Sequence, residues 1–118
     1  MKRSLTTNEH NSLSNTNFRG VLYTTLHSQL VLMSLLPDED IGAEVHQVNQ
    51  YSRCERGRGK AMIDDVLLDV SRRMGVVIFA GAKHDVTNLS STEKMKLNTV
   101  YAIPNHCYKV QHKTRAQR

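Results

Sequence analysis

Disulfide bonds, membrane spans and export signals find little support in this sequence. Its 118 residues include two cysteines, Cys54 and Cys107, which are too few for a disulfide framework, and neither belongs to a Cys-x-x-Cys pair. No apolar run approaches the roughly 18 residues that a transmembrane helix needs. Residues 1–17 contain no apolar segment of the kind that export signals carry. We therefore expect a soluble, cytoplasmic protein with no membrane partner.

Aromatic residues are also scarce, at 5% of the chain, and tryptophan is absent. Sixteen Lys and Arg against eleven Asp and Glu give a formal charge of +5 and a pI near 9.5, which would suit acidic partners. Much of the positive excess lies in Lys2, Arg3 and residues 109–118. A nucleic-acid groove usually combines a basic stripe with aromatic stacking platforms. The composition therefore argues against a nucleic-acid partner.

The length fits a single domain with one core. Residues 1–17 are rich in Ser, Thr and Asn and have little to bury, which predicts a flexible N-terminal arm or a segment ordered by a partner subunit. We place the domain at residues 18–114 and a C-terminal tail at 115–118. No helix of ordinary length is predicted.

Short β-prone runs separated by turn residues fill the domain and predict an all-β fold. The run at 29–36 is almost continuously apolar, which predicts a strand covered on both sides. Seven to nine closely spaced strands are typical of a sandwich or barrel. The expected strands are 21–25, 29–36, 43–46, 50–55, 60–63, 66–70, 76–79, 84–88 and 95–101.

A carboxylate, two imidazoles and an amide recur at a spacing that suits a metal site. Because successive side chains of a strand point to opposite faces, Glu44 and His46 would face the same way, and so would His84 and Asn88. The residues between His46 and Gln50 allow a turn that brings Gln50 alongside. Such a set suits a divalent first-row metal with open positions for water, substrate or, with Fe(II), O₂.

Spacing alone leaves a simpler explanation open. A chain with six histidines places some His and Glu close together by chance. A histidine on a strand is also often a half-buried side chain with no ligand.

These residues resemble the cupin superfamily, and in particular the small single-domain cupins called mannose-6-phosphate-isomerase-like. The first cupin motif ends in His-x-His, then Glu after three or four residues and Gly after six more. This chain has that spacing at Glu44, His46, Gln50 and Gly57. The second half of the second motif is matched by Gly81, His84 and Asn88. The resemblance covers residues 17–114.

The chain also departs from the cupin pattern. Glu44 stands where most cupins have the first His, and Gln50 stands where they have Glu. The loop between His46 and Gln50 looks one residue shorter than in the subgroup, which would displace Gln50 from a metal. Three turn or strand-end positions differ as well, namely Asp38 and Arg73 for glycines and Phe79 for a proline.

The resemblance implies a double-stranded β-helix, the jelly-roll barrel whose mouth holds the ligand. It also implies a homodimer formed by exchange of edge strands, through the N-terminal arm or the strand at 21–25. It also implies a divalent transition metal (Mn, Fe, Ni or Zn), bound by Glu44, His46, Gln50 and His84. The expected partner is a small polar or anionic molecule.

Three further residues are candidates for contact with that molecule. Tyr101 would point inward from the last predicted strand, His106 would flank the mouth, and Lys83 would stand at its rim. A solvated lysine and an exposed loop histidine explain Lys83 and His106 equally well. Cys54 shares its strand face with Gln50 and has no adjacent base, which indicates a core residue rather than a nucleophile.

Three classes of function remain open. The chain could be a metal-dependent enzyme, either a sugar isomerase or a dioxygenase-like cupin, a non-catalytic cupin that binds or senses a small molecule, or a metal-free structural protein. An enzyme needs an acid or base within reach of substrate, and beyond the ligands the sequence offers no convincing candidate, the best being Tyr101 and His106. This favours binding over catalysis, or proton transfer by metal-bound water. We therefore assign no catalytic residue and rank a metal-binding cupin of undetermined activity first.

Overall fold

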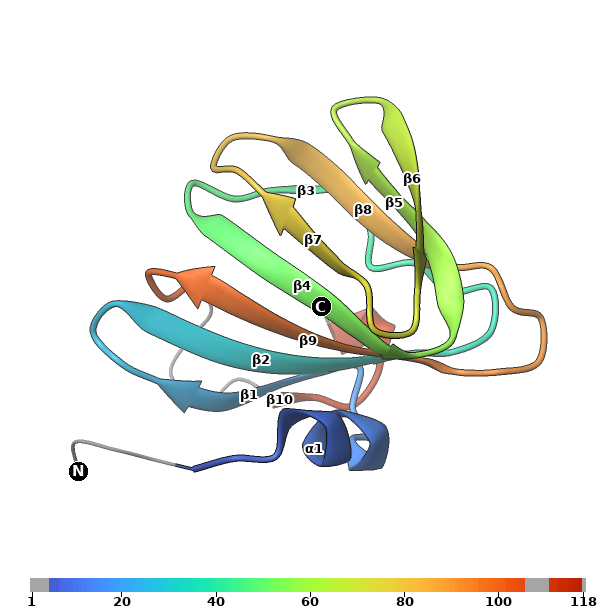
Figure 1. Cartoon of the computed structure of the whole chain (residues 1–118), viewed down its shortest axis with the longest axis horizontal. Helices are drawn as coiled ribbons and strands as arrows, with labels where there is room; N and C mark the ends of the chain where they lie inside the picture. The colour runs from blue at the N-terminus through green and yellow to red at the C-terminus, as the bar shows by residue number, and fades with distance from the viewer. Residues whose placement is uncertain (1–4, 106–110, 118) are drawn as a thin grey trace.

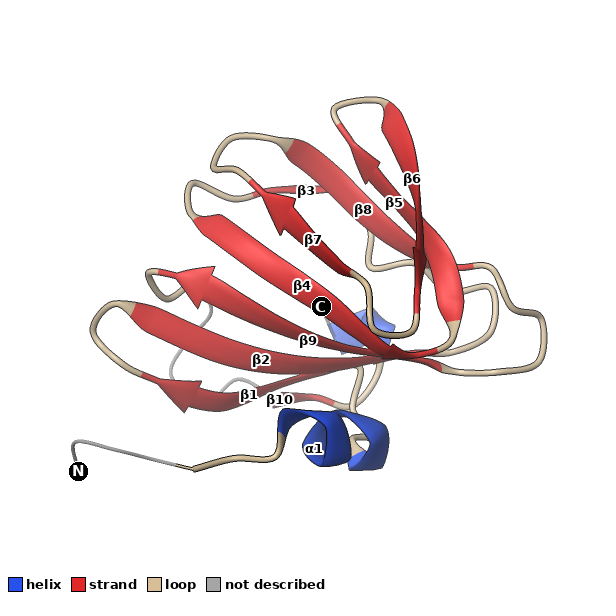
Figure 2. Ribbon diagram, in the orientation of Figure 1, coloured by secondary structure: helices blue, strands red, loops and turns tan. Residues whose placement is uncertain are grey.

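Antiparallel strands form 53% of the protein and helices 9%. A computed structural model describes residues 5–105 and 111–117 and contains one short helix, α1 (Asn8–Ser14), and one 3-10 turn, Arg115–Gln117 (Figure 2). No helix within these ranges is long and apolar enough to cross a membrane. The strands are β1 (Arg19–Thr24), β2 (Ser28–Leu35), β3 (Glu44–Val45), β4 (Asn49–Arg56), β5 (Arg58–Ile63), β6 (Val66–Ser71), β7 (Gly75–Ile78), β8 (Lys83–Asn88), β9 (Met95–Ala102) and β10 (Gln111–His112).

The strands build two sheets that face each other (Figure 1). One sheet has the order β10-β1-β2-β9-β4-β7 and the other β3-β8-β5-β6, and every pairing is antiparallel. This arrangement is the jelly roll, so the predicted all-β, double-stranded β-helix is confirmed. Each of the nine predicted runs overlaps an observed strand. The two-residue β10, which pairs with β1, was not predicted.

The core lies between the sheets and follows the two-residue alternation of the strands. Val31, Met33 and Leu35 of β2 lie beside Met95 and Leu97 of the neighbouring strand β9, and all five are part of this core. Every residue of β2 from Gln29 to Leu35 is buried, which confirms a strand covered on both sides. Cys54 is fully buried, and burial raises the pKa of its thiol to about 11, as befits a core residue.

Helix α1 lies against β2, β4 and β9, within the segment that composition predicts to be an arm. Buried hydrogen bonds attach it to the sheet. Ser12 is fully buried and its Oγ accepts a hydrogen bond of 3.1 Å from Asn98 Nδ2. The ammonium of Lys96, itself buried, donates to the carbonyl of Asn15, just past the helix, and to Ser34 Oγ at 3.0 Å. With Leu13 half exposed, the helix has no apolar stripe for a sequence pattern to reveal. The boundary at residue 17 stays a prediction.

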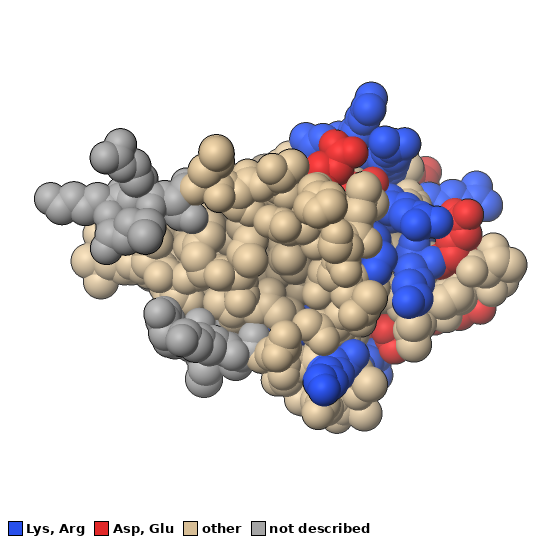
Figure 3. Space-filling view, turned by 90° about the horizontal axis from the view of Figure 1, so that it is seen from below, with Lys and Arg blue, Asp and Glu red and all other residues tan. Residues whose placement is uncertain are grey.

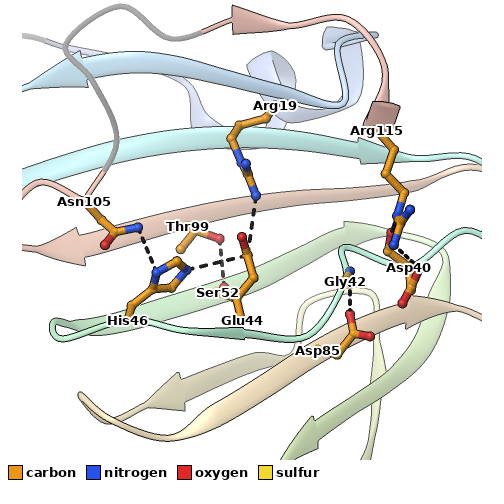
Figure 4. Close-up of polar contacts among 10 residues, drawn as sticks. All are labelled: Arg19, Asp40, Gly42, Glu44, His46, Ser52, Asp85, Thr99, Asn105 and Arg115. Atoms are coloured by element: carbon orange, nitrogen blue, oxygen red, sulfur yellow. Dashed lines mark hydrogen bonds and ion pairs between the residues drawn. The ribbon is translucent and has the colours of Figure 1, made fainter. Parts of the chain in front are cut away.

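Residues of the predicted C-terminal tail also contact the barrel. Arg115 Nη2 lies 3.1 Å from Asp40 Oδ1, and its Nε donates to the Asp40 carbonyl at 2.6 Å (Figure 4). On the neighbouring strand β8, Asp85 Oδ1 accepts a bond of 3.0 Å from the Gly42 N–H. The carboxyl groups of Asp40 and Asp85 are hydrogen-bonded to each other. This small cluster fixes the loop that leads into β3.

The Asp85 carboxyl should make the stability of the metal-free protein depend on pH. Burial, and then the hydrogen bond and negative charge of Asp40, raise the pKa of Asp85 to about 6. The folded state therefore binds more protons than the unfolded state between about pH 4 and pH 6. Unfolding free energy should fall as pH rises through this window. In Asp85→Asn, which keeps the acceptor for Gly42, that fall should disappear. Urea unfolding of chelator-treated protein at a series of pH values measures it.

The exposed carboxylate Asp65 provides the control for that experiment. Asp65→Asn removes a charge from a surface turn and should leave the pH profile like that of the wild type. An Asp85→Asn protein whose stability still falls between pH 4 and pH 6 would contradict the assignment to Asp85.

Two residues that replace cupin glycines keep a left-handed backbone. Asp38 has φ of 62° and Arg73 has φ of 71°. Arg73 is the third residue of a turn closed by a bond of 3.0 Å from the Met74 N–H to the Ser71 carbonyl. This conformation costs a residue with a Cβ about 1–2 kcal/mol. Both positions thus have a backbone conformation that favours glycine, and their side chains place strain there.

Restoring glycine at Arg73 should relieve that strain. Arg73→Gly is expected to raise the unfolding free energy by up to ~1 kcal/mol, because relief of the left-handed strain exceeds the entropy that a glycine adds to the unfolded chain. Arg72→Gly, one residue earlier and without a positive φ, should be destabilising instead. Urea denaturation of the two variants compares them. Equal effects would show that the backbone conformation is not the cause.

Candidate metal centre

One end of the barrel gathers four of the polar residues that the motifs predict. The motif residue Asn88 lies at the other end of β8, where its amide donates to backbone carbonyls. In one sheet, Glu44 of β3 pairs with His84 of β8, which pairs with Ile63 of β5. In the facing sheet, Tyr101 of β9 lies between two inward-facing amides, Gln29 of β2 and Gln50 of β4. The loops after β1, β3 and β7 meet at this end, which we call the mouth (Figure 1).

Glu44, His46 and His84 converge at the mouth. Each offers one ligand atom, and these atoms all lie within 4.8 Å of one another. His46 Nε2 is 3.6 Å from Glu44 Oε1, and the rings of His46 and His84 have centroids 5.1 Å apart. His84 is 4% exposed, whereas the side chains of His46 and Glu44 are 12% and 19% exposed. The cluster is therefore shielded from bulk water and still open on one side.

A backbone carbonyl sets the tautomer of His84. Its Nδ1 lies 3.0 Å from the Ala82 carbonyl oxygen, which can only accept, so Nδ1 carries the proton. Neutral His84 then presents the lone pair of Nε2. A second hydrogen bond of this kind is what orients histidines that ligate metals.

His46 is oriented by Asn105, a residue that sequence reasoning missed. The Asn105 amide nitrogen lies 3.0 Å from His46 Nδ1 (Figure 4). If the Asn105 amide is rotated by 180°, its oxygen accepts a hydrogen bond from the Nδ1–H of His46. The Nε2 atom of His46 is then able to bind a metal. The Asn105 backbone N–H donates to Gln29 Oε1 at 3.1 Å, and Gln29 Nε2 donates to Thr24 Oγ1 at 3.0 Å. A chain of hydrogen bonds from the β1–β2 turn thus positions the imidazole.

Gln50 is buried at the mouth with its amide oxygen unsatisfied. It is 7% exposed and faces inward, with Tyr101 and Ile78 beside it on the neighbouring strands. Its Oε1 has no hydrogen-bond partner among the described residues. Such a group costs about 1–3 kcal/mol when it is left unpaired. A neutral oxygen donor in this position suits a bound cation, so the donor set fits a divalent metal.

Arg19 is the second residue that sequence reasoning missed. It lies on β1 opposite Met33 and is 3% exposed. Its Nη2 is 3.5 Å from Glu44 Oε1, the same oxygen that faces His46. The β1 register alone brings Arg19 inward, and no spacing motif marks it.

The structure describes two of the three residues that we predict to contact the small molecule, and they lie in different environments. Tyr101 is 2% exposed, and its ring meets that of His46 edge-on at 5.7 Å. Burial strongly raises the pKa of Tyr101, so its phenol is neutral at physiological pH. Lys83 is exposed, and strand alternation turns its side chain away from the inward-facing His84. His106 lies outside the described residues.

Sequence comparison finds relatives of unassigned activity. No family model matches the chain. It is 40% identical over 99 residues to the uncharacterized protein L612 of Acanthamoeba polyphaga mimivirus, a match that covers 80% of this chain. The chain spans 62% of the length of that protein and 58% of a second curated relative from Bacillus subtilis.

Structural comparison extends the likeness over the whole fold. The crystal structure of BH2720 from Bacillus halodurans matches with a TM-score of 0.92 and 33% identity, and covers 98% of this chain and 92% of that one. An RmlC-like cupin from Shewanella frigidimarina matches with a TM-score of 0.68 at 12% identity, and covers 75% of this chain and 77% of that one. At such identity the second match shows a shared fold alone.

Proposed function

We propose that this chain, which belongs to the same family as BH2720 and L612 and shares the fold of an RmlC-like cupin, is itself a cupin that binds one divalent transition metal at the barrel mouth and there binds or converts a small polar or anionic molecule. The observation that carries this proposal is the convergence of Glu44, His46 and His84 within 4.8 Å. Gln50, with its unsatisfied amide oxygen, is the proposed fourth donor. Two imidazoles, a carboxylate and an amide suit Mn, Fe, Ni or Zn.

The residues around this set define what the site can do. A divalent metal held there would act as a Lewis acid toward an oxygen of the bound molecule. Ala82 and Asn105 hold the two imidazoles, and the buried walls keep bulk water from the inner side. Tyr101 contributes a neutral hydroxyl. An isomerase acting on a sugar phosphate, as in mannose-6-phosphate-isomerase-like cupins, or a dioxygenase-like reaction would use these parts.

A non-catalytic binding or sensing role is the second candidate, and the chemistry of Tyr101 favours it. Proton transfer at neutral pH needs a group whose pKa lies near 7. Burial moves the pKa of Tyr101 further above that range. Tyr101 therefore suits a hydrogen-bond donor to a bound molecule better than a base.

We further propose that the protein is cytoplasmic and works as a homodimer. Strand β6 is an edge of its sheet, and its Val66 and Leu67 are 57% and 63% exposed. Exposed apolar side chains on an edge strand are a ready surface for a second copy. Sedimentation equilibrium of the wild type and of Leu67→Lys tests this, since only the wild type should dimerise.

Elemental analysis tests the metal proposal. Protein purified without chelator or affinity metal should retain about one Mn, Fe, Ni or Zn per chain, or take one up when each ion is offered after dialysis. A chain that retains none of the four ions would contradict the proposal. The identity of the ion would then narrow the chemistry to that of the metal.

A further inference from the structure

The mouth contains a buried cation, Arg19, that makes few hydrogen bonds within the described structure. Arg19 is 3% exposed and its guanidinium has five N–H donors. In the described structure its Nε makes no hydrogen bond, and its ion pair with Glu44 is a long contact of 3.5 Å. Below the guanidinium the Phe18 ring lies 5.4 Å away, so that side is apolar. Few buried arginines are so poorly paired.

The partner of Arg19 is also a proposed metal ligand. Glu44 Oε1 lies between Arg19 Nη2 at 3.5 Å and His46 Nε2 at 3.6 Å. Without a metal, the guanidinium and the carboxylate balance each other. A divalent ion adds two positive charges and draws Glu44 to itself. Arg19 then keeps its charge and loses its counter-ion, in a place where an unpaired charge is costly.

We propose that Arg19, released when Glu44 turns to the metal, holds the carboxylate or phosphate group of the ligand, so that metal and anion bind cooperatively. This inference rests on the proposed metal site and names the ligand class: a small molecule with an oxyanion within reach of both the metal and Arg19. A planar guanidinium binds such a group through two parallel hydrogen bonds.

The distribution of surface charge strengthens the role of Arg19. In Figure 3 the Lys and Arg side chains of the described residues on one face gather toward one end of the molecule, with Asp and Glu side chains among them. Arg58 and Arg72 lie close together where β5 begins and β6 ends, which is far from the mouth. Lys83, near the mouth, points away from the cluster. Among the residues that the structure describes, Arg19 is the buried cation beside Glu44 and is therefore the group placed to recognise an anion inside the mouth.

Calorimetry with glycolate as the probe tests the coupling. Glycolate carries a carboxylate beside a hydroxyl, and glycolamide is its neutral counterpart. Glycolate should bind Ni²⁺-loaded protein at least tenfold more tightly than metal-free protein, because in the metal-free protein Arg19 is paired with Glu44. Glycolamide should show no such gain. Linkage requires that saturating glycolate tighten Ni²⁺ binding by the same factor, a measurement that needs no variant.

Arg19→Gln separates this role from a structural one. The loaded variant should bind glycolate at least tenfold more weakly than the loaded wild type. Its affinity for Ni²⁺ should be unchanged or higher, because a cation that competes for Glu44 has gone. Arg19→Lys, which keeps the charge without the planar fork, should recover part of the glycolate affinity. Circular dichroism of each variant checks the fold.

The possible outcomes separate this inference from the proposed function. Wild type that binds no Ni²⁺ overturns both. Wild type that binds Ni²⁺ but gains no affinity for glycolate overturns the inference and leaves the metal site standing. The inference is also overturned, and the metal site left standing, if Arg19→Gln binds glycolate as tightly as the wild type does. A variant that loses affinity for Ni²⁺ together with affinity for glycolate has the same meaning.

Discussion

His84→Ala is expected to abolish stoichiometric metal retention. The substitution removes a lone pair that the Ala82 carbonyl has already oriented toward the cluster, and it leaves Glu44 and His46 on one short segment, with the neutral amide of Gln50, as the remaining donors. The loss of affinity should exceed the 10- to 100-fold that removal of an orienting partner typically costs. Elemental analysis of the purified variant and titration with Ni²⁺ measure the effect, and His46→Ala should behave in the same way.

Two further substitutions are compared with His84→Ala, one expected to have no effect on metal binding and one expected to have an intermediate effect. His27→Ala, in the exposed turn between β1 and β2, removes a histidine from the surface and should leave metal content unchanged. Asn105→Ala removes the amide that orients His46 and should weaken binding by about 10- to 100-fold. Melting curves in the presence of chelator check that each variant is folded. Stoichiometric metal in a folded His84→Ala protein would exclude the proposed ligand set.

Gly59→Ala should destabilise the barrel severely, although it adds a single methyl group. A Cβ built on Gly59 of β5 would lie 1.9 Å from the Thr87 carbonyl oxygen of β8, which is backbone and cannot rotate away. The two strands would have to separate where Gly59 pairs with Asn88. We expect a loss of at least about 4 kcal/mol, the range of severe overpacking and strain, or failure to fold. Urea denaturation and soluble yield report it.

Gly20→Ala is the matched control. Gly20 also lies in a strand, β1, but a Cβ there meets Asn17 Nδ2 at 3.8 Å, an ordinary van der Waals distance. Its effect on unfolding should stay within about 1 kcal/mol. A Gly59→Ala protein as stable as Gly20→Ala would mean that β5 and β8 are less closely packed than the structure shows.

The strands were predictable because their signals are local. The run at 29–36 and the alternation at 95–101 show burial within a few residues. The first became a strand buried on both sides, and the second a strand with Met95, Leu97 and Tyr101 in the core. Glu44, His46 and His84 could be grouped because strand parity and the cupin spacing agree. Gln50 was expected to face the same lumen, and its inward, buried side chain does so despite the short loop before it.

What escaped prediction depends on contacts between distant segments. Arg19 meets Glu44 across 25 positions of sequence, and Asn105 meets His46 across 59. Only the register of β1 on β2, and the path of the chain after β9, bring these pairs together. Helix α1 escaped for another reason, because buried polar bonds such as Asn98 to Ser12 hold it, and polar residues alone look like a linker.

The position of strand β3 affects how quickly a bound metal ion could leave the site. It is two residues long, stands at the edge of its sheet and is paired with β8. It carries Glu44, with His46 just beyond its end, while His84 stands on a strand paired on both sides. Fraying of this edge would free two of three ligands without disturbing the core. We therefore expect release of a bound ion on the timescale of this local opening, far faster than the barrel unfolds.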